Sequence, residues 1–191
     1  MTAESSDSEV IAASLNNPEL FGAIFHRHYP AVYRFVVGAV GLGDGPDLAS
    51  EVFVRAFAIR SRYDMSYSRA TPWLFGIASN LVRGYHRSAA RQLRAFRREA
   101  TRVPGSTEFE DDAVTRLAAL SQRPRIAFAL SQLRTEEAEV VLLFAIAGLS
   151  YQDIAVAVGI PEGTVRSRLS RARTKLRNLI DANDESNADD E

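Results

Sequence analysis

The sequence predicts an all-α fold with two small helical domains joined by a flexible linker. Apolar residues recur at helical spacing, no segment shows the alternation of a β-strand, and an acidic stretch with Pro and Gly separates two basic segments. The predicted organisation is an acidic disordered tail over 1–17, a helical domain over 18–102, a linker over 103–112, a second helical domain over 113–180 and an acidic tail over 181–191.

Three helices are predicted in the first domain. Apolar residues at spacings of three and four mark one helix that ends near the turn Asp44–Asp47 and a second over Leu48–Phe57. The polar segment Ser61–Thr71 predicts a loop. A third helix begins at Thr71, a good N-cap residue that precedes Pro72 at the tolerated first position.

Two short helices near the C-terminus have the spacing of a helix-turn-helix. A helix over Thr135–Ala147 comes first, and Ser150 then caps a short helix over Tyr151–Val158. Gly159 supplies the turn, and Pro161 starts the next helix, which is strongly basic. This arrangement predicts a DNA-binding unit, and an ordinary helical hairpin with a solvated basic face is the alternative.

The net charge hides an uneven distribution. Lys plus Arg number 23 and Asp plus Glu number 24, so the formal net charge of -1 argues against a nucleic-acid binder. Arg83–Arg102, however, carries +6 and Glu162–Arg177 carries +5, while residues 181–191 carry -6. Two basic helices thus stand between acidic segments, which favours DNA binding.

Position along the basic helix separates two kinds of DNA contact. Residues near the start of a recognition helix face base edges, and later cations reach phosphates. The base-contacting candidates are Glu162, Thr164, Arg166 and Ser167. The phosphate-contacting candidates are Arg168, Arg171 and Arg173.

Several classes of function are excluded or unsupported. The chain has no cysteine, which excludes disulfides, thiolate catalysis and cysteine-ligated metals. His26 and His28 fall on different helix faces with no third ligand, so no metal site and no cofactor are expected. No phosphate loop or catalytic cluster of acids supports an enzyme. The start Met1–Glu9 is not a signal peptide, and apolar runs are too short to cross a bilayer, so we expect a cytoplasmic protein.

Four segments resemble bacterial sigma factors of the extracytoplasmic-function group (group IV). Gly148–Leu176 resembles their promoter-binding helix-turn-helix and Phe21–Val40 the first helices of their N-terminal domain. Asp47–Phe57 resembles their polymerase-binding helix, and Trp73–Asn80 their promoter-melting helix. Two departures are Ser50, where the family commonly has Gln, and Gly84, where it commonly has an acidic residue.

The resemblance implies a protein that binds core RNA polymerase, reads an upstream (−35) element as duplex and opens a downstream (−10) element. It implies a loop that holds a flipped base, for which we expect Tyr63 and Tyr67, while Trp73 is expected in the core. The downstream single-strand candidates are Tyr63, Tyr67, Arg69, Asn80, Arg83, His86 and Arg87. The candidates for polymerase binding are Asp47, Glu51, Phe53 and Arg55. A partner anti-sigma factor, often at the membrane, is implied by the resemblance alone.

Two other functions account for part of the sequence. A helix-turn-helix regulator with an N-terminal sensor domain explains the second half but leaves Leu48–Phe57 and Trp73–Arg87 unexplained. The second alternative, and the third hypothesis in all, is an interaction module that sequesters polymerase or a partner. Run-off transcription with core polymerase separates the three, because only a sigma factor confers promoter-dependent starts without another one present.

Overall fold

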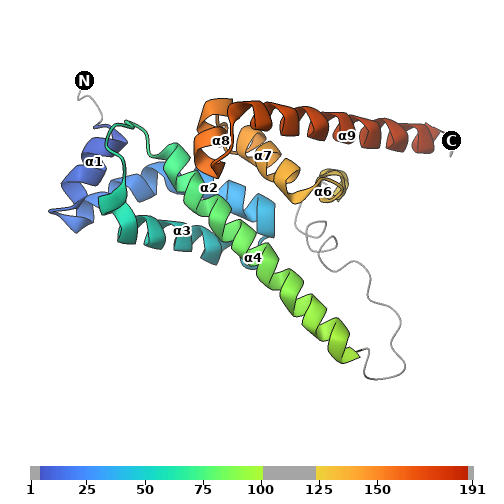
Figure 1. Cartoon of the computed structure of the whole chain (residues 1–191), viewed down its shortest axis with the longest axis horizontal. Helices are drawn as coiled ribbons and strands as arrows, with labels where there is room; N and C mark the ends of the chain where they lie inside the picture. Colours follow the sequence, from blue (N-terminus) through green and yellow to red (C-terminus); the bar gives the residue numbers. More distant parts are fainter. Residues whose placement is uncertain (1–4, 101–123, 189–191) are drawn as a thin grey trace.

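The computed structural model describes residues 5–100 and 124–188, and every regular element in these residues is helical, as predicted (Figure 1). The first half contains α1 (Asp7–Ser14), the 3-10 turn η1 (Pro18–Phe21), α2 (Gly22–Val40), α3 (Gly45–Ile59), the 3-10 turn η2 (Arg60–Arg62) and α4 (Thr71–Ala100). The second half contains α6 (Pro124–Ser131), α7 (Thr135–Ala145), α8 (Tyr151–Val158) and α9 (Glu162–Ala188).

Helices α2, α3 and α4 form a bundle around the apolar faces predicted from their spacing. Phe35 of α2 and Phe75 of α4 meet edge to face with ring centroids 5.4 Å apart, and Val52 of α3 is fully buried beside them in the same core. Gly41 ends α2 with φ 91°, a conformation that favours glycine, so the turn into α3 starts slightly earlier than predicted. The bundle fixes the start of α4 and the loop before it.

Helices α8 and α9 form the predicted helix-turn-helix. The hydroxyl of Ser150 accepts a hydrogen bond from the Asp153 N–H at 3.1 Å, which caps α8. Gly159 ends α8 in the left-handed conformation, φ 69°. Ile154 and Val165 are fully buried between the two helices, so one side of α9 is committed to the core and the other is free.

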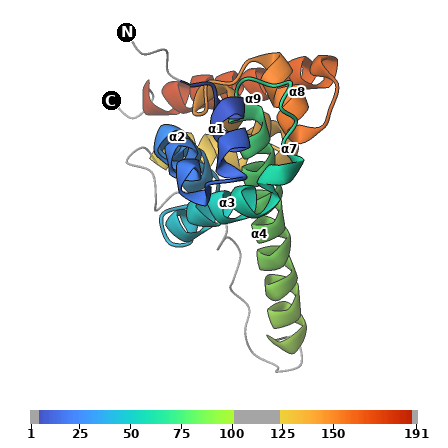
Figure 2. The ribbon, with the colours of Figure 1, turned by 90° about the vertical axis from the view of Figure 1, so that its left-hand side faces the viewer.

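The two halves of the chain pack directly against each other. One cluster of buried side chains runs from Ile11 of α1 to Leu169 of α9, and α8 lies across α4 (Figures 1 and 2). A Cβ on Gly76 of α4 would lie 2.9 Å from the carbonyl oxygen of Ala157 in α8. Backbone therefore meets backbone here, at a separation that only glycine permits.

An ion pair accompanies this packing. Arg83 of α4 lies 3.3 Å from the carboxylate of Glu139 in α7, which is almost fully buried. Burial raises the pKa of Glu139, and the attraction to Arg83 and Arg168 only partly opposes this effect. The protein therefore buries a carboxylate at some cost in order to join the two halves.

The acidic ends of the chain depart from the expected disorder. Residues 7–14 form α1, because Ser6 and Glu9 make a capping box and Ile11 enters the core. At the other end α9 extends to Ala188. The predicted linker over 103–112 lies outside the described residues.

Two glycines of α4 provide a test of the packing between the halves. We expect Gly76→Ala to lower the free energy of unfolding by about 1–3 kcal/mol, because its Cβ meets the backbone of α8. Gly84→Ala has no atom within 4 Å of the added Cβ and should raise stability by about 0.5–1 kcal/mol. Denaturant unfolding measures both, and equal stabilisation by the two variants would contradict the close approach.

The buried carboxylate gives a pH-dependent prediction. A raised pKa means that the folded protein favours the neutral acid, so stability is lost as the pH rises through that pKa. We expect Glu139→Gln to be more stable than the parent at pH 8, with the difference shrinking as the pH falls toward the usual carboxyl range. Arg83→Gln should be less stable than the parent at pH 8, and thermal unfolding across pH measures both. A lower stability of Glu139→Gln at pH 8 would contradict this account.

Candidate nucleic-acid interface

The outward face of α9 carries most of the predicted duplex contacts. Glu162, Arg166, Ser167, Arg171 and Arg173 are exposed, whereas Thr164 and Arg168 are half-buried. The guanidinium of Arg166 lies 3.0 Å from the carboxylate of Glu162 one turn earlier. The exposed set forms one polar, mostly basic surface on the second helix of the helix-turn-helix.

A buried acid in α7, Glu137, pairs with two cations of α9. The Glu137 carboxylate accepts a hydrogen bond from the Lys175 ammonium at 2.9 Å and lies 3.6 Å from the Arg171 guanidinium. The Lys175 ammonium and the Arg134 N–H outweigh burial and hold the pKa of Glu137 below its usual value. Glu137 thus anchors α9 while leaving Arg171 60% exposed.

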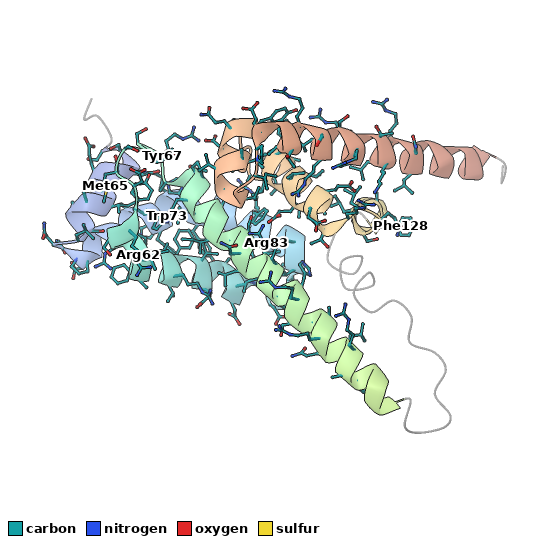
Figure 3. The ribbon with its side chains drawn as sticks, in the orientation of Figure 1. Arg62, Met65, Tyr67, Trp73, Arg83 and Phe128 are labelled. Atoms are coloured by element: carbon teal, nitrogen blue, oxygen red, sulfur yellow. The ribbon has the colours of Figure 1, made fainter. Side chains whose placement is uncertain are left out.

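A second surface surrounds the start of α4. A groove of about 410 Å³, here called the α4 groove, is bounded by the loop before α4, the first turns of α4, and α8. It brings together four of the predicted single-strand candidates, Tyr63, Tyr67, Arg69 and Asn80. Arg62 and Trp73 line it as well, and Figure 3 shows them with Tyr67 near the same end of the molecule.

The two tyrosines of the loop differ in what they can contact. Tyr67 is 48% exposed, whereas Tyr63 is buried, donates a hydrogen bond from its hydroxyl to the Tyr67 carbonyl at 2.7 Å, and packs edge to face on Trp73. Burial and the nearby charges of Asp7 and Asp64 raise the pKa of Tyr63 to about 12. Tyr67 is therefore presented to solvent, and Tyr63 supports the loop from inside.

The remaining predicted single-strand residues lie elsewhere on α4. Arg83 and His86 line a separate cavity of about 240 Å³ between α2, α4, α6 and α7. Arg83 bonds to Asn80 at 2.5 Å and to Glu139, and burial lowers the pKa of His86 despite a hydrogen bond to the Ala39 backbone. Arg87 is exposed farther along the helix. The structure therefore divides the predicted set into the groove, the cavity between the halves and an open helix face.

The predicted polymerase-binding residues also differ in exposure. Asp47 and Arg55 are exposed and Glu51 is half-exposed, with 2.7 Å between the Arg55 guanidinium and the Glu51 carboxylate. Phe53 is instead buried and packs edge to face on Phe25, so the folded chain does not present it to a partner. Val54, which is not among the predicted residues, is 61% exposed on the same helix. Val54 directly follows the buried residues Val52 and Phe53. A third apolar residue in a row was the signal in the sequence that one of them lies off the buried face.

The described residues were searched for metal-binding groups and for helices that could span a membrane. His28 lies 2.8 Å from the Asp7 carboxylate, and residues 5–100 and 124–188 contain no group of three His, Asp or Glu side chains suited to a metal ion. Among the described helices, none combines the length and apolar character needed to span a membrane.

Comparison with known proteins gives the family. The sequence profile described as Sigma-70 region 2 matches residues 24–92, and that described as Sigma-70, region 4 matches residues 123–176. The ECF RNA polymerase sigma factor SigC of Mycobacterium tuberculosis is 31% identical over 187 residues, which cover 95% of this chain and 96% of that protein. RNA polymerase sigma factor CarQ of Myxococcus xanthus is 32% identical and covers 85% and 90%.

Solved structures agree with the sequence relatives. CnrH, a sigma factor of Cupriavidus metallidurans solved in complex with the cytosolic domain of CnrY, matches with a TM-score of 0.67 and 28% identity over 92% of this chain and 97% of that one. The sigma factor RpoE from Bartonella quintana, solved with the anti-sigma factor NepR, shares the fold with a TM-score of 0.65 and 24% identity over 84% and 96%. Both matching profiles describe regions of sigma factors, and neither describes an enzyme family. The chain belongs to the extracytoplasmic-function sigma factors, which bind core RNA polymerase and direct it to specific promoters.

Proposed function

We propose that this sigma factor contacts promoter DNA through two separate surfaces. The outward face of α9 reads the upstream (−35) element as duplex, and the α4 groove holds one strand of the opened downstream (−10) element. The observation that carries the proposal is the gathering of exposed Tyr67, Arg69 and Asn80 at one groove, apart from the exposed basic face of α9.

The helix-turn-helix supports the duplex role. Its second helix leaves its first two turns free on one side, so Arg166 and Ser167 can reach base edges in a major groove. Arg171 and Arg173 follow one and two turns later, where phosphates would lie. The Arg173 guanidinium already sits 5.4 Å above the Phe144 ring, which limits where that cation can point.

The α4 groove has the chemistry that an unpaired base requires. Tyr67 offers an aromatic face for stacking, Asn80 offers an amide for a base edge, and Arg62 and Arg69 offer charge to the backbone. Tyr63 contributes by holding the loop and not by stacking on DNA, since its ring is buried. Exposed Arg87 can add a phosphate contact, whereas Arg83 and His86 face the cavity between the halves.

The α3 surface is proposed for core polymerase. Asp47, Glu51 and Arg55 supply charge, and Val54 supplies apolar area beside them. Interfaces commonly combine an apolar centre with a charged rim, which this face provides.

A protein partner and a cellular location follow from the relatives. CnrH was solved with the cytosolic domain of CnrY, and its chain is covered almost completely by this one. This supports an anti-sigma factor as a further partner here, either in solution or held at the membrane. Because the polymerase and its DNA are cytoplasmic, we propose that the chain works in the cytoplasm.

Run-off transcription with purified core polymerase tests the function as a whole. The chain should confer starts at its own promoter with no other sigma factor present. Dependence on a second sigma factor would indicate a regulator, and inhibition of a reaction driven by another sigma factor would indicate a sequestering module. Either result would overturn the proposal.

Tyr67 provides the sharpest test of the groove. We expect Tyr67→Ala to weaken binding of a downstream single strand by about 1–3 kcal/mol, because one base loses its stacking partner. Permanganate footprinting of the holoenzyme should show less open promoter, and thermal stability should be unchanged because the ring is exposed. Tyr67→Phe keeps the aromatic face and serves as the control. Normal opening by Tyr67→Ala would remove Tyr67 from the proposal.

Arg171 tests the assignment of phosphate contacts. Holoenzyme with Arg171→Ala should bind all upstream duplexes more weakly by a similar factor, and the slope of log K against log salt should fall by about 1. Arg34→Ala, an exposed arginine on α2, is the charge-matched control and should change neither quantity. A loss confined to one upstream sequence would show that Arg171 reads bases instead.

A further inference from the structure

Asp7, at the start of α1, ties three separate segments together. One carboxylate oxygen accepts a hydrogen bond from the Arg27 guanidinium at 2.6 Å. The other lies 2.8 Å from the His28 ring and accepts a hydrogen bond from the Ala70 N–H at 2.7 Å. The Asp7 N–H in turn donates to the Ser68 carbonyl at 3.0 Å. Asp7 is only 5% exposed, so these bonds are shielded from water.

The loop that carries Tyr67 is therefore held at both ends. At its start Tyr63 is buried and bonds to the Tyr67 carbonyl, and at its end Ser68 and Ala70 bond to Asp7. The residues between these anchors, including Met65 and Tyr67, project into solvent (Figure 3). Asp7 thus sets the path of the loop where it enters α4.

A carboxylate suits this position better than its amide. Three donors converge on two oxygens, and Ala70 is fully buried, so its N–H has no access to water if Asp7 is lost. Burial raises the pKa of Asp7, but the hydrogen bonds from His28, Ala70 and Arg27 outweigh burial and hold that pKa far below its usual range. Asparagine would place an N–H₂ group against one of these donors.

We infer that Asp7 is a positioning residue for recognition of the downstream strand: through Ser68 and Ala70 it fixes the loop that presents Tyr67 and Arg69 to the α4 groove. Asp7 lies outside residues 24–92, which match the region 2 profile. The inference rests on the proposed role of the groove. It adds the requirement that Asp7 hold the loop, which the groove alone does not imply, because Asp7 is neither a lining residue of the groove nor part of α9.

The test compares Asp7→Asn with Glu9→Gln. Both remove one negative charge from α1, but Glu9 is exposed and only caps the helix, a role that Gln also fills. In the holoenzyme, Asp7→Asn should reduce affinity for a downstream single-stranded oligonucleotide about tenfold, since charge-assisted hydrogen bonds that order the loop are lost. Binding of upstream duplex should stay within about twofold, because α9 is untouched. Glu9→Gln should match the parent in both assays.

Hydrogen exchange gives a second readout. Peptides covering residues 64–70 should exchange faster in Asp7→Asn than in the parent, while peptides from α9 should not change. Equal losses of affinity for the downstream strand and the upstream duplex would show a general folding role and overturn the inference. Full affinity for the downstream strand despite faster exchange of the loop would also overturn it. If Asp7→Asn fails to fold, His28→Gln removes one partner of the Asp7 carboxylate. This variant should lose less affinity than expected for Asp7→Asn, and only for the downstream strand. Unchanged affinity of His28→Gln for that strand would overturn the inference.

Tyr67→Ala separates this inference from the proposed function. If Tyr67→Ala binds the downstream strand normally, the groove itself is wrongly assigned. If Tyr67→Ala loses affinity and Asp7→Asn does not, the groove stands and only the positioning role of Asp7 fails.

Discussion

The close approach of α8 to α4 is the constraint on which the rest of the arrangement depends. Gly76 lets the Ala157 carbonyl reach the α4 backbone, and about two turns farther along α4 the pair of Arg83 and the buried Glu139 of α7 adds a second link. Through these contacts the cores of the two halves become one continuous cluster. Helix α4 therefore supports both surfaces that are proposed to contact DNA.

Helix α8 consequently has two roles. It is the first helix of the helix-turn-helix, where Ile154 supports α9, and its Val156 and Ala157 also bound the α4 groove. A strand that occupied the groove, as proposed, would lie against α8. The charge is also unevenly distributed, because α9 exposes a basic face although the formal net charge of the chain is -1.

Local signals in the sequence were sufficient for much of the fold. The cap at Ser150, the left-handed Gly159 and the apolar spacing between them placed α8 at its observed bounds, since each acts within a few residues. Helix α1 was missed because its acidic composition resembles a solvated tail. The partners that bury Asp7 are Arg27, His28 and Ala70, which lie 20 to 63 residues away. No local pattern reports such contacts.

The candidate site was predictable in residue type but not in arrangement. Exposed Tyr67 and buried Tyr63 are four residues apart in one polar loop, and only the fold distinguishes them. Arg83 and His86 stand at the start of the basic run of α4, yet packing of the second half directs them into the cavity between the halves. Likewise Gly76 is a weak helix former in sequence and becomes meaningful only when α8 lies against it.

The most direct test of this account is the distance between the two halves in the free protein. Because the chain has no cysteine, the exposed residues Ala58 on α3 and Ser170 on α9 can be changed to cysteine and spin-labelled without background. Pulsed electron–electron double resonance should give one narrow distribution of distances between the two labels, centred on the separation of these two positions in the structure. A broad distribution, as expected for two domains moving independently on a tether, would contradict the packing of α8 on α4.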